Sequence, residues 1–240
     1  MNIDTISKLN DYAQIPGRFQ AAGLEVPEGF AWAVDAYRWT VDVPAMPVMD
    51  RIMTARTNQE FQKAAAEYVH AVEQHNAFAG PVAQEINRTR GSVLMNAFKQ
   101  HKPELLETVI AAYDRQAQTV GPLLAGLPEL RSANLFSLGV ETATALVAAR
   151  EEVDTLRTIL GAYLAILSER EPKVPGESFL VRLAEFEDSR QLAEAARSVH
   201  QDGATAPVSP FLGLVTAGAR LRLATPSDAR DHLRQLQDAA

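Results

Sequence analysis

Residues 146–167 read LVAAREEVDTLRTILGAYLAIL, and apolar side chains recur along them at alternating steps of three and four residues. Such steps are the a and d positions of a heptad, which line one side of a helix. The a and d residues are Leu146, Ala149, Val153, Leu156, Leu160, Tyr163 and Leu167. The pattern predicts a helix from about 128 to 169 that presents a continuous apolar seam.

The neighbours of this seam point to two kinds of partner. Glu152 falls at g and Arg157 at the following e position, the spacing of an interhelical ion pair in a parallel dimer. Further along, Ile159, Leu164 and Ile166 place apolar side chains at e and g, so the second half of the helix is apolar on most sides. We therefore expect the spine of a helical bundle, and whether the seam packs within one chain or between chains stays open.

Prolines mark the starts of many other helices, because a proline at the first helical position loses no hydrogen bond. The predicted helices cover about 3–14, 27–39, 47–56, 58–79, a run after Pro81, 103–120, 128–169, 177–187, 189–201, 210–223 and 226–238. Residues 219–223 alternate with period two, so a strand is the alternative there. We predict an all-α multi-helix bundle in which a short connection at 121–127 makes helix 103–120 an antiparallel neighbour of the long helix.

Three parts are expected along the chain. Residues 1–57 form short helices with an extended arm, residues 58–170 form the bundle core with its long hairpin, and residues 177–240 form a smaller C-terminal helical segment that ends in a helix pair. The Pro- and Gly-containing stretch at 171–176 is the linker before the last part.

Composition excludes several classes of function. The 240 residues include no cysteine, which rules out disulfides and thiolate chemistry. A net charge of −7 disfavours nucleic acid as a partner, since a polyanion is repelled at long range. The first residues show no secretory pattern, and no apolar run reaches the ~20 residues of a membrane-spanning helix. We expect a cytoplasmic protein, or one within a particle formed in the cytoplasm.

Catalytic and cofactor motifs are missing from the sequence. It has no Gly-x-Ser-x-Gly elbow, no phosphate-binding glycine loop and no dinucleotide turn. Glu67 and His70 form the only Glu-x-x-His pair, whereas a di-iron bundle needs two such pairs. We expect no enzyme and no cofactor, with Glu67 and His70 as the weak candidates for a metal site.

Two surfaces are candidates for contacts with other proteins. Trp32 and Trp39 share a stripe opposite Phe30, Val34 and Tyr37, so helix 27–39 is either buried on both sides or anchors a partner through its tryptophans. The C-terminal helix pair carries the apolar anchors Leu233 and Leu236. Its arginines alternate with aspartates, which weakens the alternative of a DNA-binding helix pair.

These features favour a non-catalytic structural or assembly protein that acts through helix-mediated contacts, with itself as a homo-oligomer or with other components. In architecture alone, the chain resembles bacteriophage scaffolding and other virion-assembly proteins, although no motif belongs to a named family. That resemblance implies a component or scaffold of a larger assembly. The alternatives are a bundle metalloprotein that uses Glu67 and His70, or a DNA-associated regulator that uses the C-terminal helix pair.

Overall fold

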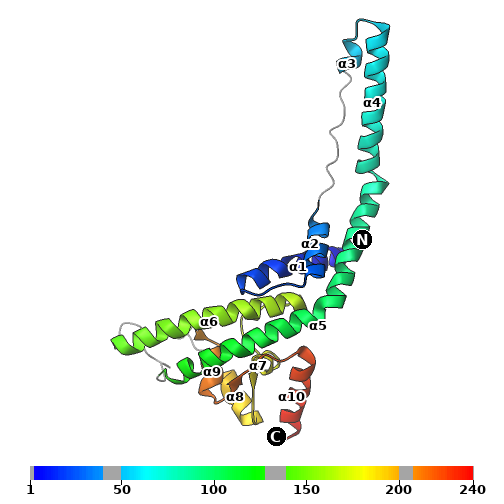
Figure 1. The fold of residues 1–240 in the computed structure, drawn as a ribbon. Helices are drawn as coiled ribbons and strands as arrows, with labels where there is room; N and C mark the ends of the chain where they lie inside the picture. The colour runs from blue at the N-terminus through cyan, green and yellow to red at the C-terminus, as the bar shows by residue number, and fades with distance from the viewer. Residues whose placement is uncertain (1–2, 40–49, 128–138, 200–207, 240) are drawn as a thin grey trace. The chain divides into compact units, whose positions relative to one another are not determined.

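The computed structural model describes residues 3–39, 50–127, 139–199 and 208–239 (Figure 1). These residues are mostly helical, with almost no strand, which confirms the predicted all-α class. The backbone divides into two compact units, one of residues 1–13 and 28–100 and the other of residues 14–27 and 101–240. The three-part division at 57 and 170 stays a prediction.

The first unit begins with α1 (Ile3–Ala21), of which it includes the part up to Ala13, and α2 (Glu28–Arg38). Their apolar sides meet α5 (Pro81–Ala125) near its Phe98, whose ring stacks on Tyr12 with centroids 3.9 Å apart and an interplanar angle of 13°. Phe30 of α2 lies tilted against the same ring at 6.2 Å. The buried apolar residues around them are Leu9, Ala13, Ala33, Val34 and Leu94.

The remaining helices of this unit are α3 (Asp50–Met53) and α4 (Asn58–Ala79). The sequence places the start of α4 correctly, because Thr57 and Glu60 form a reciprocal capping box around its first turn. The helix predicted at 47–56 is shorter than expected, and residues 47–49, like the extended arm at 41–44, lie outside the described residues.

Two helices continue through prolines at which the sequence predicts a break. α1 runs through Pro16 to Ala21 instead of ending at 14, and α5 is one helix of 45 residues that contains Pro103 and Pro122. An internal proline costs a helix about 3 kcal/mol. Burial offsets this cost, since Ile15 and Phe19 lie on either side of Pro16, and Leu105 and Val109 follow Pro103, all with 0% exposure. The short connection predicted at 121–127 is therefore wrong, because α5 continues to Ala125.

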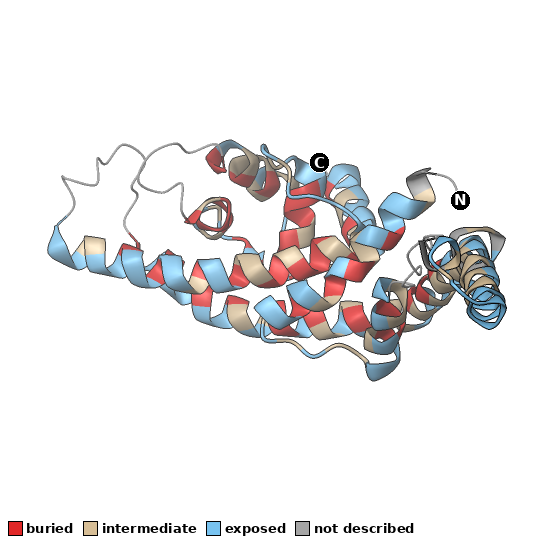
Figure 2. Cartoon of the chain, turned by 90° about the horizontal axis from the view of Figure 1, so that it is seen from above, coloured by how far each residue is buried: buried red, intermediate tan, exposed pale blue. Residues whose placement is uncertain are grey.

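The second unit is built on α6 (Val140–Leu167), which runs antiparallel to the part of α5 from His101 onward (Figures 1 and 2). Residues 128–138, where the sequence predicts the start of this helix, lie outside the described residues. Ten residues of α6 are buried, including the three apolar residues at the e and g positions. They are Leu146, Ala149, Val153, Leu156, Ile159, Leu160, Ala162, Tyr163, Leu164 and Ile166.

Glu152 and Arg157 both have partners within their own chain, and an ion pair between them across a parallel dimer stays a prediction. The Glu152 carboxylate accepts a hydrogen bond of 2.6 Å from the Gln116 amide of α5. Arg157 lies 3.6 Å from Asp154 and donates to the carbonyl of Ser209. Both side chains therefore bind within their own chain.

Helices and two very short strands complete the second unit. They are α7 (Glu177–Leu183), β1 (Ala184–Glu185), α8 (Ser189–Ser198), α9 (Phe211–Thr216), β2 (Arg220–Leu221) and α10 (Pro226–Asp238). The strands pair antiparallel, with Ala184 opposite Leu221 and Glu185 opposite Arg220.

These strands correct two helix predictions. Helix 177–187 ends at Leu183, and helix 210–223 ends at Thr216, so the alternative of a strand within 219–223 is right for Arg220 and Leu221. Gly218 ends α9 with φ of 84°, a conformation that glycine adopts without a steric penalty. Helix 189–201 ends early, at Ser198, whereas α10 starts where the Thr225 cap predicts and ends at Asp238, as expected.

Candidate interaction surfaces

One exposed surface of the first unit lies on α4 and the start of α5. Every side chain whose burial is described between residues 52 and 90 is exposed or half-buried. Phe61, Val69 and Val82 are 50%, 54% and 48% exposed. A soluble helix usually buries one side, whereas no side chain whose burial is described in α4 is fully buried by the other described residues.

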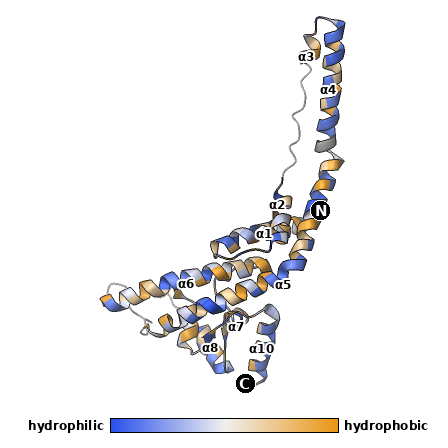
Figure 3. Cartoon of the chain, viewed as in Figure 1, coloured by the Kyte–Doolittle hydropathy of each residue, from blue (hydrophilic) through white to orange (hydrophobic). Residues whose placement is uncertain are grey.

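This surface has the geometry of a packing seam. Phe61, Ala65, Tyr68, Val72 and His75 follow one another at steps of four and three residues, which places them on one side of α4. Val82 and Ile86 of α5 follow at the same spacing in the sequence, although Gly80, with φ of −108° and ψ of −140°, interrupts the helix between them and α4. We call these seven residues the arm face. The mixture of polar and apolar residues along α4 is visible in Figure 3.

Charged residues lie away from the arm face. At about 100° per residue, Glu60, Lys63, Glu67 and Glu73 all project at least ~100° from its centre. Glu60 also accepts hydrogen bonds from the backbone N–H groups of Arg56 and Thr57, at 2.9 and 3.2 Å, and these bonds lower the pKa of its carboxyl. The helix is thus amphipathic, with its charges on the side opposite to the seam.

Glu67 and His70 lie on α4 without a metal-binding arrangement around them. The Nε2 atom of His70 lies 3.1 Å from the side-chain nitrogen of Gln74 on the next turn. Within the part of the chain that the structure describes, no three His, Cys, Asp or Glu side chains gather closely enough to hold a metal ion. The structure therefore adds nothing to the metal hypothesis.

Trp32 and Trp39 are exposed on α2, at 64% and 57%. On the opposite side of this helix Phe30 and Val34 are buried, and the Tyr37 hydroxyl donates to Asn10 at 2.9 Å. The guanidinium of Arg90 lies 5.9 Å from the centre of the Trp39 ring, within the range of a cation–π contact. Among the described residues, α2 is therefore buried on one side only, and the alternative of burial on both sides is wrong.

The other residues expected to make contacts belong to the core of the second unit. Leu146, Val153, Leu156, Leu160 and Tyr163 are buried in α6, and Leu167 is half-buried. In α10, Leu236 is buried and Leu233 is half-buried. The buried side chains are used by the chain itself and are not available to another protein without unfolding.

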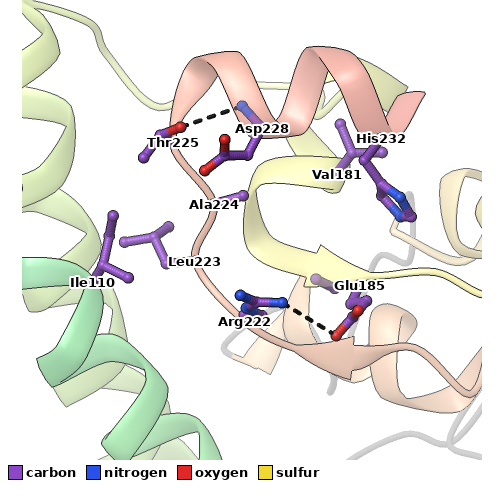
Figure 4. A pocket seen from close by; sticks show the side chains of 10 residues that line it. Ile110, Val181, Glu185, Arg222, Leu223, Ala224, Thr225, Asp228 and His232 are labelled. Carbon is purple, nitrogen blue, oxygen red and sulfur yellow. Dashed lines mark hydrogen bonds and ion pairs between the residues drawn. The ribbon is translucent and has the colours of Figure 1, made fainter. Parts of the chain in front are cut away.

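The second unit also contains a cavity of about 260 Å³ between α5, α7 and α10 (Figure 4). Its lining residues are Ile110, Val181, Ala184, Glu185, Arg222, Leu223, Ala224, Thr225, Asp228 and His232. Figure 4 shows Arg222 and Glu185 pointing toward each other at the mouth, with 3.7 Å between Nη1 and Oε2.

The polar groups of this cavity are engaged in holding the fold. The backbone N–H of Phe186 donates to Nε2 of His232 at 3.3 Å, so this nitrogen acts as an acceptor. Thr225 caps α10 by accepting from the N–H of Asp228 at 3.2 Å. A nucleophile with an adjacent base, the arrangement that covalent catalysis requires, is not formed by the residues that line this cavity.

Two buried tyrosines fix the chain around the cavity. The hydroxyl of Tyr113 donates to the carbonyl of Leu183 at 3.0 Å, and that of Tyr163 donates to the carbonyl of Ala224 at 2.8 Å. Burial raises the pKa of Tyr163 to about 12 and raises that of Tyr113 well above its usual value. Both hydroxyls therefore remain neutral donors through the ordinary range of pH.

A comparison of the chain with protein-family models, curated proteins and solved structures found no match of any of the three kinds. Among the described residues, no helix combines the length and the apolar character needed to cross a bilayer.

The sequence contained a signal for the arm face. The spacing of Phe61, Ala65, Tyr68, Val72 and His75 is visible without a structure, but it predicts only that one side of the helix packs against something. Whether other parts of the first unit cover this side depends on where they lie, and the spacing within one helix carries no information on that.

Proposed function

We propose that this chain is a non-catalytic structural or assembly protein whose arm face makes helix-mediated contacts between proteins. It works as a homo-oligomer or as a component or scaffold of a larger assembly, in the cytoplasm or within a particle formed there. The observation that carries the proposal is that no side chain whose burial is described in α4 and the start of α5 is fully buried, although Phe61 and Val82 are large and apolar.

The chemistry of the arm face supports a protein partner. Exposed apolar surface of this kind, bordered by polar residues, is typical of protein–protein contact sites. The spacing of four and three residues matches a second helix that lies nearly parallel or antiparallel. The exposed tryptophans of α2 add residues that are common among the energetically important positions of interfaces.

The C-terminal arginines do not favour the DNA alternative. Arg222 lies 3.7 Å from Glu185, and Arg234 lies 3.9 Å from Asp231. A carboxylate beside each guanidinium weakens the attraction of phosphate groups.

Two neighbouring alanines provide a matched test of the proposal. Ala65 lies on the arm face and Ala66 points away from it, so Ala65→Glu and Ala66→Glu make the same chemical change on opposite sides of α4. We expect Ala65→Glu to reduce the mass of the protein in solution to that of a single chain, 26.2 kDa. Ala66→Glu should leave an oligomer intact, because its new carboxylate stays in water.

Light scattering over a range of concentrations gives the mass, and far-UV circular dichroism confirms that both variants keep their helices. Equal masses for the wild type, Ala65→Glu and Ala66→Glu at all concentrations would contradict self-assembly through the arm face.

A further inference from the structure

The cavity between α5, α7 and α10 in the second unit has a largely apolar lining. Val181, Ala184 and Leu223 are buried and Ile110 and Ala224 are half-buried, and all five line it. The cavity volume of about 260 Å³ is several times the ~30 Å³ that one molecule of liquid water occupies. The cavity can therefore take a small molecule that has a short apolar chain.

Most polar groups of the cavity are already paired. The guanidinium of Arg222 lies 3.7 Å from the carboxylate of Glu185, so these two charges largely offset each other. The ring of His232 accepts the N–H of Phe186 through Nε2, which only a neutral imidazole can do. With this ring neutral, the lining contains two carboxylates and one guanidinium and is negative overall.

The exposed carboxylate of Asp228 supplies the excess negative charge. Within the described part of the chain, no hydrogen bond or ion pair engages its oxygens, and only its backbone N–H is bound, by Thr225. In Figure 4, Asp228 lies at the start of α10, away from Arg222 and Glu185. Its charge reaches the protein interior, because after burial it is among the groups that raise the pKa of Tyr163. The cavity thus offers an acceptor for a cation together with an apolar lining.

We propose that this cavity binds a primary ammonium group on a short alkyl chain, either of a free amine or of a lysine side chain. The ammonium group donates to the Asp228 carboxylate, and the alkyl chain lies on the apolar lining. Such a charge-assisted hydrogen bond is about twice as strong as a neutral one, whereas an anion would be repelled by Asp228. The site belongs to the second unit and does not depend on the arm face.

Two small molecules test the proposal on the full-length protein. n-Butylammonium and 1-butanol share the same alkyl chain and differ in the charge of the head group. NMR titration of the backbone amides of Ala184, Leu223 and Ala224 reports binding at the cavity. We expect saturable shifts, with n-butylammonium binding at least about tenfold more tightly than 1-butanol, because only the cation forms the charge-assisted hydrogen bond.

Two aspartates of α10 provide matched variants. Asp228→Asn removes the charge from the cavity with almost no change of shape, and Asp231→Asn makes the same change outside the cavity lining. Asp228→Asn should weaken the binding of n-butylammonium about tenfold or more and leave that of 1-butanol unchanged. Asp231→Asn should change neither. Ala224→Leu, which fills part of the cavity, should weaken both molecules by the same factor.

The remaining outcomes separate the two sources of the ammonium group and define failure. Nα-acetyl-lysine methylamide, a blocked lysine, should match n-butylammonium if the natural ligand is a lysine side chain, and tenfold weaker binding supports a free amine. Equal affinity of the wild type for n-butylammonium and 1-butanol would overturn the cation site. Shifts that do not saturate, or an equal loss of affinity in Asp228→Asn and Asp231→Asn, would overturn it as well.

Discussion

Tyr113, Tyr163 and Asp114 connect segments of the second unit that are far apart in sequence. Each tyrosine donates to a backbone carbonyl, and Asp114 accepts from the N–H of Leu223 at 2.9 Å. Because the folded protein raises the pKa of both phenols above the unfolded value of about 10, their contribution to stability is complete below pH 10. This contribution is lost as pH rises from there through the folded pKa, which is about 12 for Tyr163.

Replacing the two phenols tests whether their ionisation lowers the stability of the protein at high pH. We expect Tyr113→Phe and Tyr163→Phe each to lower the free energy of unfolding by about 1 kcal/mol at pH 7, the usual net value of one hydrogen bond. The loss of stability between pH 9 and pH 11 should be smaller in the double variant than in the wild type, because the phenols no longer ionise on unfolding. Denaturant unfolding followed by circular dichroism at each pH measures both effects. If the free energy of unfolding depended on pH in the double variant as it does in the wild type, the two phenols would not be the source of that dependence.

Glu60 is expected to respond to acid in the opposite sense. Hydrogen bonds from two backbone N–H groups lower the pKa of its carboxyl in the folded state, so the capping box is complete above the unfolded pKa of about 4.3 and is lost as pH falls through the folded value. The first turn of α4 should therefore fray in acid. Amide exchange of residues 58–62 by NMR measures this fraying, and Glu60→Gln, which lacks the titrating group, should show no such pH dependence.

At the scale of the elements, predictions based on local capping chemistry were the accurate ones. The starts of α4 and α10 follow from Thr57 with Glu60 and from Thr225, whose hydrogen bonds reach only three residues along the chain. The lengths of α1 and α5 were wrong because the cost of an internal proline is local, whereas the burial that offsets it comes from distant residues. β1 and β2 depend on the pairing of Ala184 with Leu221 and of Glu185 with Arg220, which are far apart in the sequence, and alternation in a single segment does not reveal such pairing.

Two glycines within helices should respond oppositely to alanine. A Cβ on Gly213 of α9 would lie 3.1 Å from the backbone of Ser198 and Val199, whereas a Cβ on Gly161 of α6 would meet nothing within 4 Å. We expect Gly161→Ala to raise the free energy of unfolding by about 0.5–1 kcal/mol, because alanine loses less backbone entropy on folding. Gly213→Ala should lower it, since backbone cannot move aside as a flexible side chain can. Thermal unfolding of both variants measures the two changes in stability, which should have opposite signs.

For the whole molecule, the seam of α6 is the main stabilising feature of the second unit. Leu160 is only 1% exposed, so Leu160→Asp would bury an unpaired carboxylate at a cost of several kcal/mol, comparable with the net stability of a typical domain. We expect this variant to lose its cooperative unfolding transition in circular dichroism. Glu152→Ala removes only the half-buried contact with Gln116 and should change the free energy of unfolding by less than about 1.5 kcal/mol. A cooperative transition in Leu160→Asp would contradict the role of the seam.

The sequence therefore predicts the class of the fold and the burial of the seam better than it predicts the candidate site. Apolar periodicity shows which side of a helix packs, but not against what. For α6 the partner is the chain's own α5, whereas α4, with a similar pattern, has no fully buried side chain among those whose burial is described. Trp32 and Trp39 show the same limit, because their shared stripe is visible in the sequence and their exposure is not.

The bonds of Tyr113, Tyr163 and Asp114 also bear on the order in which the chain can fold during its synthesis. They connect residues 70, 61 and 109 positions apart, and their later partners are Leu183, Ala224 and Leu223. A ribosome that has released only the first 180 residues has exposed α5 and α6 without the segments that complete their core. The second unit therefore cannot finish folding until its last elements emerge, and until then the nascent chain depends on the hairpin alone to resist aggregation.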